Sequence, residues 1–326
     1  MNRRLADCCS LQGPFPVIDS KKLYHQGNLS PLERSLFLAL SLLAKGRKRN
    51  PFFNDFYPVP SCFEGVPNDG RENAPPLSLT FPTLLLGLTF ATKNPFPIPP
   101  WEKNGDISLP VSPKFPLIES FLDDVDRVGQ IFQNAGIDLL GIKSRRIQPL
   151  EFNALLDQTG LKSDLLAEET LSLASRMVTP ILNRIDRRFS EKEGKEPIFL
   201  LLLCDKLGGR NRYRDRLDRH FPSIQLRTIT ESRPLSVYRS DRNVPVLMEV
   251  RFQAKGESNL RTALASIASK YLREISMIPF NRFWTSQIPD LKPTAGYPVD
   301  AKRFRTETET LRQSLSIPDK EFWRNK

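Results

Sequence analysis

The sequence has few of the residues that build zinc centres and disulfide frameworks. It contains two histidines and four cysteines among 326 residues. The cysteines are Cys8, Cys9, Cys62 and Cys204. Their spacing matches no metal-ligand motif, and two histidines argue against a histidine-rich zinc site. We therefore expect a reduced, cytoplasmic protein in which Cys204 is a small core residue.

Long hydrophobic runs are absent as well. The most apolar run, FPTLLLGLTFA at 81–91, is interrupted by proline and too short to span a bilayer. The N-terminus carries two arginines without the long apolar stretch of a signal peptide. Hydrophobic residues make up 39% of the chain and charged residues 26%, which is typical of a soluble globular protein. The sequence thus predicts no membrane partner.

Acidic residues are fewer than basic ones. The chain has 48 lysines and arginines against 37 acidic residues, a formal net charge of +11. This balance favours anionic partners, nucleic acid first, although a basic surface can also serve solubility alone. Two basic clusters are candidates for phosphate contacts, KGRKRN at 45–50 and RNRYRDRLDR at 210–219. In the second, Asp215 and Asp218 alternate with arginines as on a solvated helix face, which favours a structural role.

The first strong secondary-structure signal is a helix that starts at Ser30. Ser30, Pro31 and Glu33 match a capping box with proline at the first helical position. Gly46 is expected to end this helix. The apolar stripe consists of Leu32, Leu36, Leu40 and Leu43.

A proline-rich segment separates two parts of the chain. It holds fourteen of the 28 prolines, and stretches such as YPVPSCFEGVPNDG are typical of loops and turns. Because it also carries apolar residues, we interpret it as an irregular insertion that lies on the main body. The expected division is an N-terminal segment at 1–50, the insertion at 51–117 and the main body at 118–326.

The main body has the pattern of an α/β fold. The apolar run at 198–203 predicts a strand buried on both faces, as in a parallel or mixed sheet. The alternation at 246–252 predicts a half-buried antiparallel strand. Other expected elements are helices at 118–132, 163–189 with a kink at Pro180, 208–221, 260–283 and 299–315, a strand at 223–232, and two short strands or a hairpin at 137–147 before a further helix.

Acidic residues follow two of these strands. Asp205 comes directly after one strand and Glu257 after another. Loops that follow strand ends can converge on a ligand, and two carboxylates there could hold a hard divalent cation such as Mg²⁺. Paired metals can activate water for phosphodiester cleavage. The structural alternative is that Asp205 begins a turn and Glu257 caps a helix that starts at Ser258.

Four segments together resemble motifs of the ribonuclease HII family, in the same order. They are VIDSKKLY at 17–24, LLLCDKLGG at 201–209, KGESNLRTALASIASKYLRE at 255–274 and the closing stretch from 294 to 326. The resemblance covers most of 17–45 and 120–326. It implies a ribonuclease H-like mixed sheet flanked by helices, and a nucleic-acid partner such as an RNA:DNA hybrid or related duplex. It also implies Mg²⁺- or Mn²⁺-dependent phosphodiester hydrolysis that leaves a 3′-hydroxyl.

The resemblance assigns roles to individual residues. Asp205 and Glu257 stand where the family has metal-binding, catalytic acids. The residues implied to contact nucleic acid are Lys21, Lys22, Ser266, Lys270, Arg273 and Tyr297.

The chain departs from the family pattern at its start and at Glu257. The family opens with a strand bearing D-E-A-G-R-G, and nothing in the eighteen residues before Asp19 matches it. The resemblance therefore implies one or more missing N-terminal strands and two absent acids, and Glu257 stands where the family has aspartate. Either the chain is a truncated form of an active nuclease, or it is a degenerate relative that acts as a nucleic-acid-binding or protein-interaction module. In both cases we expect at best feeble hydrolysis from this chain.

Overall fold

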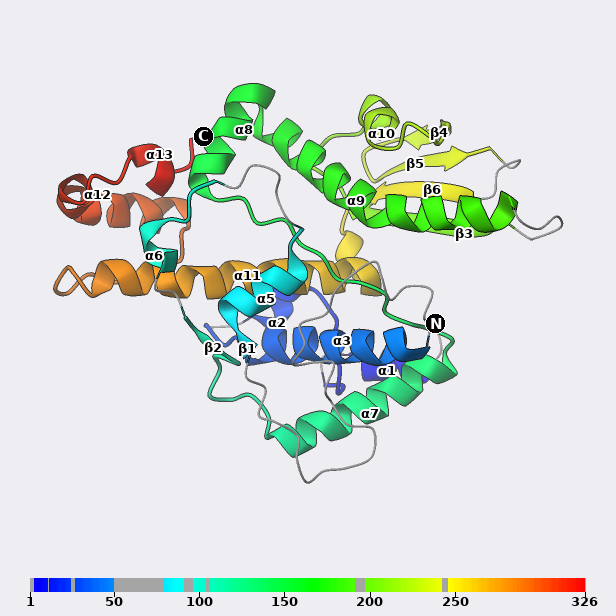
Figure 1. Ribbon diagram of the computed structural model, residues 1–326, viewed down its shortest axis with the longest axis horizontal. Helices are drawn as coiled ribbons and strands as arrows, with labels where there is room; N and C mark the ends of the chain where they lie inside the picture. The colour runs from blue at the N-terminus through cyan, green and yellow to red at the C-terminus, as the bar shows by residue number, and fades with distance from the viewer. Residues whose placement is uncertain are drawn as a thin grey trace.

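The computed structural model describes residues 3–10, 12–24, 27–49, 79–90, 96–103, 106–190, 197–241 and 246–325 (Figure 1). They form a mixed α/β fold. The helices are α1 (Arg3–Cys8), α2 (Ser20–Leu23), α3 (Ser30–Arg49), α5 (Phe81–Leu88), α6 (Pro100–Lys103), α7 (Ile118–Asn134), α8 (Pro149–Thr159), α9 (Lys162–Ser190), α10 (Arg214–His220), α11 (Leu260–Thr285), α12 (Pro298–Ser314) and α13 (Asp319–Phe322), with a 3-10 turn η2 (Gly256–Ser258). The strands are β1 (Leu79–Thr80), β2 (Ser108–Leu109), β3 (Ile198–Asp205), β4 (Leu226–Glu231), β5 (Leu235–Ser240) and β6 (Val246–Gln253).

Helices α3 and α11 pack against each other in the largest hydrophobic core. The predicted stripe on α3 is confirmed, because Leu32, Leu36, Leu40 and Leu43 are all buried. Gly46 does not end the helix, which continues to Arg49. A Cβ at Gly46 would lie 3.1 Å from the Leu139 carbonyl oxygen, so the glycine permits a close approach of the 137–139 segment.

The side chain of Glu33 turns inward instead of closing a capping box. It is fully buried, and its Oε1 accepts hydrogen bonds from the Val111 N–H (2.6 Å) and the Tyr271 hydroxyl (2.8 Å). Its Oε2 accepts one from the Ser112 N–H (2.9 Å). The predicted cap is therefore wrong. Glu33 instead joins α3 to α11 and to the segment that follows β2, because a buried carboxylate requires several donors.

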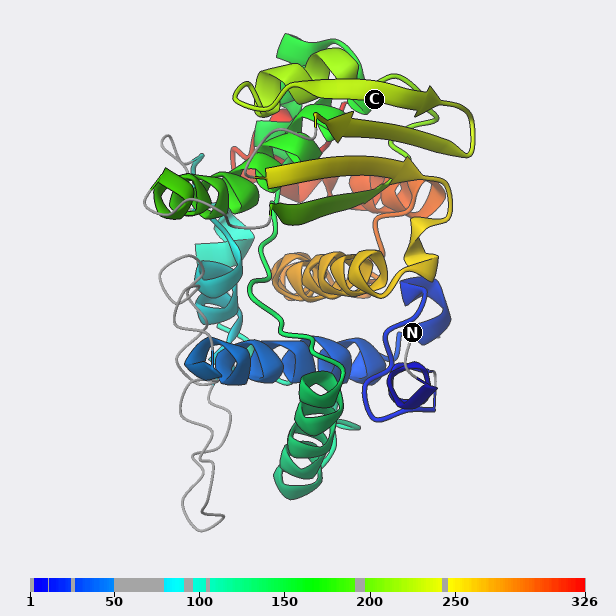
Figure 2. The same ribbon diagram turned by 90° about the vertical axis from the view of Figure 1, so that its right-hand side faces the viewer.

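The main sheet has four strands in the order β3-β6-β5-β4. Strand β3 runs parallel to β6, whereas β5 is antiparallel to both β6 and β4. Side chains of α9 and α10 pack with β4, β5 and β6 in a second core. Figure 2 shows the four strands side by side, with β3 nearest to α11.

Two strand predictions need correction. Within the described residues β3 pairs only with β6, so it is an edge strand, and Ile198 and Phe199 are 45% and 58% exposed. The prediction of burial on both faces is therefore wrong. Strand β6, expected to be antiparallel, lies between a parallel and an antiparallel neighbour. Strand β5 was not predicted, because its sequence LSVYRS lacks a clear alternation.

Other expected elements differ in extent. The 137–147 segment forms no hairpin; it is mostly irregular, and Ser144 makes an isolated parallel bridge with Thr89. The next helix, α8, begins at Pro149 as expected. Helix α9 contains Pro180, and its axis changes direction along its length (Figure 1). Helix α10 is shorter than predicted and begins at Arg214. Gly208 and Gly209 have positive φ and form a turn, and residues 210–213 are irregular.

The proline-rich segment is described only in part. Residues 50–78, 91–95 and 104–105 lie outside the described residues. The remainder contributes buried side chains to the core around α3, among them Phe81, Leu84 and Leu109. Across the described ranges, we find no helix with both the length and the apolar character needed to cross a bilayer.

Replacing Glu33 by alanine should destabilise the protein strongly. The change leaves two backbone N–H groups and the Tyr271 hydroxyl without their acceptor. We expect the free energy of unfolding in urea to fall by about 3 kcal/mol. The matched control is Glu119→Ala, at an exposed position in the first turn of α7, which should change the free energy of unfolding by less than about 0.5 kcal/mol. Equal effects of the two substitutions would contradict a central role for Glu33.

Candidate nucleic-acid interface

The carboxyl ends of β3 and β6 meet at one corner of the sheet, because the two strands are parallel. There the Asp205 Oδ1 accepts a hydrogen bond from the Gly256 N–H (3.1 Å). A Cβ at Gly256 would lie 3.3 Å from the Thr262 Cγ2 and 3.4 Å from the Asp205 Cα, so η2 packs closely against the end of β3. Asp205, which is exposed, and Glu257, which is half-buried, therefore share this corner.

Glu257 does not cap α11. That role belongs to Asn259, whose side chain accepts from the Arg261 N–H (3.1 Å). Instead, the Glu257 Oε1 accepts a hydrogen bond from the Ser266 hydroxyl (2.6 Å). Ser266 also bonds the Ser20 hydroxyl (2.9 Å), which lies 246 residues away in the sequence. This chain of three side chains connects the end of the sheet to α2.

Asp19 lies beside Glu257 at the start of α2. Its Oδ1 accepts a hydrogen bond from the Lys21 N–H (2.9 Å), so it is the N-cap of α2. This backbone hydrogen bond, followed by a hydrogen bond with the Glu257 carboxyl group, lowers the pKa of Asp19 below its ordinary value. Asp19 is therefore charged at neutral pH. Lys21 and Lys22, next along α2, are exposed.

A second cluster continues along α11, where Ser266, Lys270, Arg273 and Glu274 share one face by their helical spacing. Glu274 Oε1 lies 3.2 Å from the Lys270 Nζ and 2.5 Å from the Arg273 Nη1. Its Oε2 accepts from the Tyr24 hydroxyl (2.9 Å). The Arg273 guanidinium also lies over the Tyr297 ring, 5.2 Å from its centroid. Tyr297, at the start of α12, is 56% exposed.

We refer to these residues together as the α2–α11 surface. It comprises Asp19, Ser20, Lys21, Lys22, Tyr24, Asp205, Glu257, Ser266, Lys270, Arg273, Glu274 and Tyr297. Of the eight site residues expected from the sequence, six are connected with α2 or with one another by the contacts described above, and Lys21 and Lys22 are included because they follow Ser20 on α2. Of the other four, Asp19, Ser20 and Tyr24 belong to the segment VIDSKKLY at 17–24, and Glu274 follows Lys270 by one helical turn. These sequence positions were the signals from which the four additional residues could have been predicted.

The described part of the chain does not supply a complete metal centre. It holds no group of three or more His, Cys, Asp or Glu side chains that could bind one ion. The Asp205 Oδ1 and the Glu257 Oε1 already accept hydrogen bonds from the protein. Hard cations such as Mg²⁺ need several oxygen ligands. The residues present therefore do not fit the Mg²⁺ or Mn²⁺ site that the resemblance implies.

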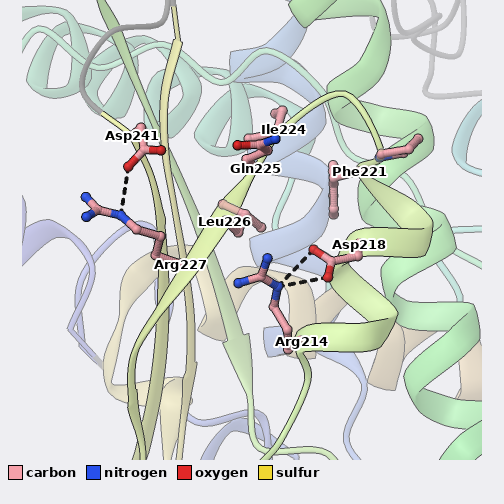
Figure 3. A pocket seen from close by; sticks show the side chains of 9 residues that line it. Arg214, Asp218, Phe221, Ile224, Gln225, Leu226, Arg227 and Asp241 are labelled. Atoms are coloured by element: carbon pink, nitrogen blue, oxygen red, sulfur yellow. Dashed lines mark hydrogen bonds and ion pairs between the residues drawn. The ribbon is translucent and has the colours of Figure 1, made fainter.

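The arginine-rich segment at 210–219 is neutralised by acidic partners. Arg216 and Arg219 pair with Glu168 on α9, and Arg210 and Arg216 pair with Asp164. Figure 3 shows Arg214 paired with Asp218, and Arg227 paired with Asp241. These residues line a pocket of about 460 Å³ between α10 and β4. This pocket lies at the opposite end of the sheet from Asp205. The structural interpretation of this segment is thus favoured over phosphate binding.

The other basic cluster, at 45–50, is described in part. Lys45 pairs with Asp126 on α7. The side chains from Arg47 to Asn50 lie outside the described residues.

Comparison of the chain with protein-family models, with curated proteins and with solved structures found no match.

The phenol of Tyr24 should titrate at unusually high pH. Burial, and then its hydrogen bond to Glu274, raise the pKa of Tyr24 from its ordinary 10.0 to about 12. Because the pKa of Tyr24 is higher in the folded than in the unfolded state, the neutral phenol favours the folded protein. This contribution to the free energy of unfolding is complete below pH 10 and is lost as the pH rises to about 12. The measurement is the ultraviolet titration of phenolate in the native protein minus that of Tyr24→Phe. A difference curve centred near the ordinary value would contradict the Tyr24–Glu274 contact.

Proposed function

We propose that the chain is a nucleic-acid-binding protein of the ribonuclease HII type with a ribonuclease H-like fold, and that the α2–α11 surface binds an RNA:DNA hybrid or related duplex. Lys21, Lys22, Lys270 and Arg273 contact backbone phosphates. Ser266 and Tyr297 contact the same nucleic-acid strand beside those phosphates. The cytoplasm is the expected location.

One observation carries this proposal. The D-S-K-K segment and the segment around Ser266 are far apart in the sequence, yet they meet in the direct hydrogen bond between Ser20 and Ser266. The segments that carry Lys21 and Lys22 and Lys270 and Arg273 therefore lie side by side, and the exposed ring of Tyr297 lies against Arg273. Phosphate contacts of this kind supply affinity and orientation without reading the base sequence.

The charge balance elsewhere supports the same assignment. The three arginines of α10 pair with acids, which leaves little surplus charge on that helix. Lys21 and Lys22 are exposed, and Lys270 and Arg273 share the carboxylate of Glu274. These parts of α2 and α11 carry more positive than negative charge, whereas Asp19, Asp205 and Glu257 lie at the adjoining end of the sheet. An anionic duplex is drawn to such a surplus.

Binding should depend steeply on salt, and the α2 lysines should set part of that dependence. Four phosphate contacts predict a slope of about −3.6 for log K against log salt, because each contact contributes roughly −0.9. Lys21→Ala combined with Lys22→Ala should reduce the slope by about two units, measured by fluorescence anisotropy with a labelled hybrid. The control pair is Lys302→Ala with Lys320→Ala, which removes the same charge from α12 and α13. The proposal is wrong if the native chain does not bind at low salt, or if the two pairs have equal effects.

Hydrolysis should be feeble in Mg²⁺ or Mn²⁺, because the described acids do not complete a metal centre. We expect a labelled RNA:DNA hybrid to be bound but scarcely cut in single-turnover assays with either ion. Any cutting that remains should disappear in Asp205→Asn. Robust cutting by the native chain would overturn the expected impairment, and loss of that cutting in Asp205→Asn would place an active site at this corner.

A further inference from the structure

Glu274 occupies the centre of the cationic part of the α2–α11 surface. Its side chain is only 11% exposed and contacts Lys270, Arg273 and Tyr24. Both cations bind the same oxygen, Oε1, and the Tyr24 hydroxyl occupies Oε2. The backbone of α11 does not need these contacts, because Glu274 lies in the interior of the helix. The carboxylate therefore acts mainly on its three neighbours.

Each cation is restrained from a second side. The Lys270 ammonium lies over the Tyr24 ring, 4.6 Å from its centroid. The Arg273 guanidinium lies over Tyr297 and also donates to the Ala295 carbonyl oxygen. Lysine and arginine side chains lose much of their conformational entropy when they are fixed in one arrangement. Here that ordering is complete before a ligand arrives, and such preorganisation strengthens binding.

The charges around Glu274 leave one positive charge in excess. Lys270 and Arg273 together carry two positive charges, and Glu274 supplies one negative charge. The Lys270 side chain is only 18% exposed, so its ammonium depends on a nearby anion for stabilisation. Lys21 and Lys22, in contrast, are exposed on α2.

We infer that Glu274 is a positioning residue: it fixes Lys270 and Arg273 so that both can bind phosphates of one nucleic-acid strand. Lys21 and Lys22 add charge from flexible side chains. This inference rests on the proposed function and assigns a task to a residue that does not itself contact the ligand.

The direction in which one substitution changes the affinity for nucleic acid tests the inference. Glu274→Gln removes a negative charge, so simple electrostatics predicts tighter binding of an anion. Positioning predicts weaker binding, because Lys270 and Arg273 lose the group that orders them. We expect the Kd for a 20-base-pair RNA:DNA hybrid to rise roughly five- to tenfold in Glu274→Gln at about 50 mM salt. The matched control is Glu307→Gln, which removes the same charge from a pair with Arg303 on α12 and should leave the Kd unchanged or lower it.

A second arm separates positioning from general loss of structure. In a chain that already carries Lys270→Ala and Arg273→Ala, Glu274→Gln should no longer weaken binding, because the residues through which it acts are absent. The ultraviolet titration should show the Tyr24 phenol returning toward its ordinary pKa. Should Glu274→Gln fail to fold, Glu274→Asp takes its place; its shorter side chain keeps the charge but draws it back from both cations, and it too should weaken binding.

The outcomes distinguish the two proposals. Binding by Glu274→Gln that equals or exceeds that of the native chain overturns the positioning role and leaves the proposed function intact. An equal weakening with and without Lys270 and Arg273 also overturns it. If the native chain does not bind the hybrid, the proposed function fails and the inference fails with it.

Discussion

The buried carboxylate of Glu33 is the contact on which the arrangement of the helices depends. It lies between α3 and α11 and satisfies donors from Val111, Ser112 and Tyr271 at once. A buried charge of this kind tolerates few alternative arrangements, because each lost donor leaves an unpaired polar group. It therefore fixes α11 relative to α3. The face of α11 that carries Lys270 and Arg273 is consequently held beside α2, the helix that precedes α3 in the sequence.

The helices could be predicted from the sequence more completely than the sheet. The stripe on α3 depends on local spacing, and all four of its leucines are buried. In contrast, the burial of β3 depends on its neighbours. A run such as IFLLLL usually occupies the centre of a sheet, yet here it has a partner on one side only among the described residues. Glu33 shows the same limit. Its spacing to Ser30 fits a capping box equally well, and the direction of its side chain is decided by donors distant in the sequence, namely Val111, Ser112 and Tyr271.

The candidate site was partly predictable because it draws on motifs with fixed spacing. Lys21 and Lys22 follow Asp19, and Lys270 and Arg273 follow Ser266 on one helical face. The sequence could not reveal that Ser20 and Ser266 touch, since that contact depends on how α2 packs against α11. Nor could it reveal the position of Glu274 between two cations and a tyrosine. The acids at the strand ends were found, but their hydrogen bonds to Gly256 and Ser266 appear only in three dimensions.

The separation of 246 residues between Ser20 and Ser266 has a consequence for biosynthesis. At roughly 5–20 residues per second, α2 leaves the ribosome some 12–50 seconds before the segment that it must pack against. Until α11 emerges, the apolar side of α3 has no partner from that helix, and the lysines of α2 are exposed without their neighbours. Contacts of such high sequence separation also slow folding. The contact between α2 and α11 thus forms only after α11 has emerged, and a nascent chain cannot use this surface before then.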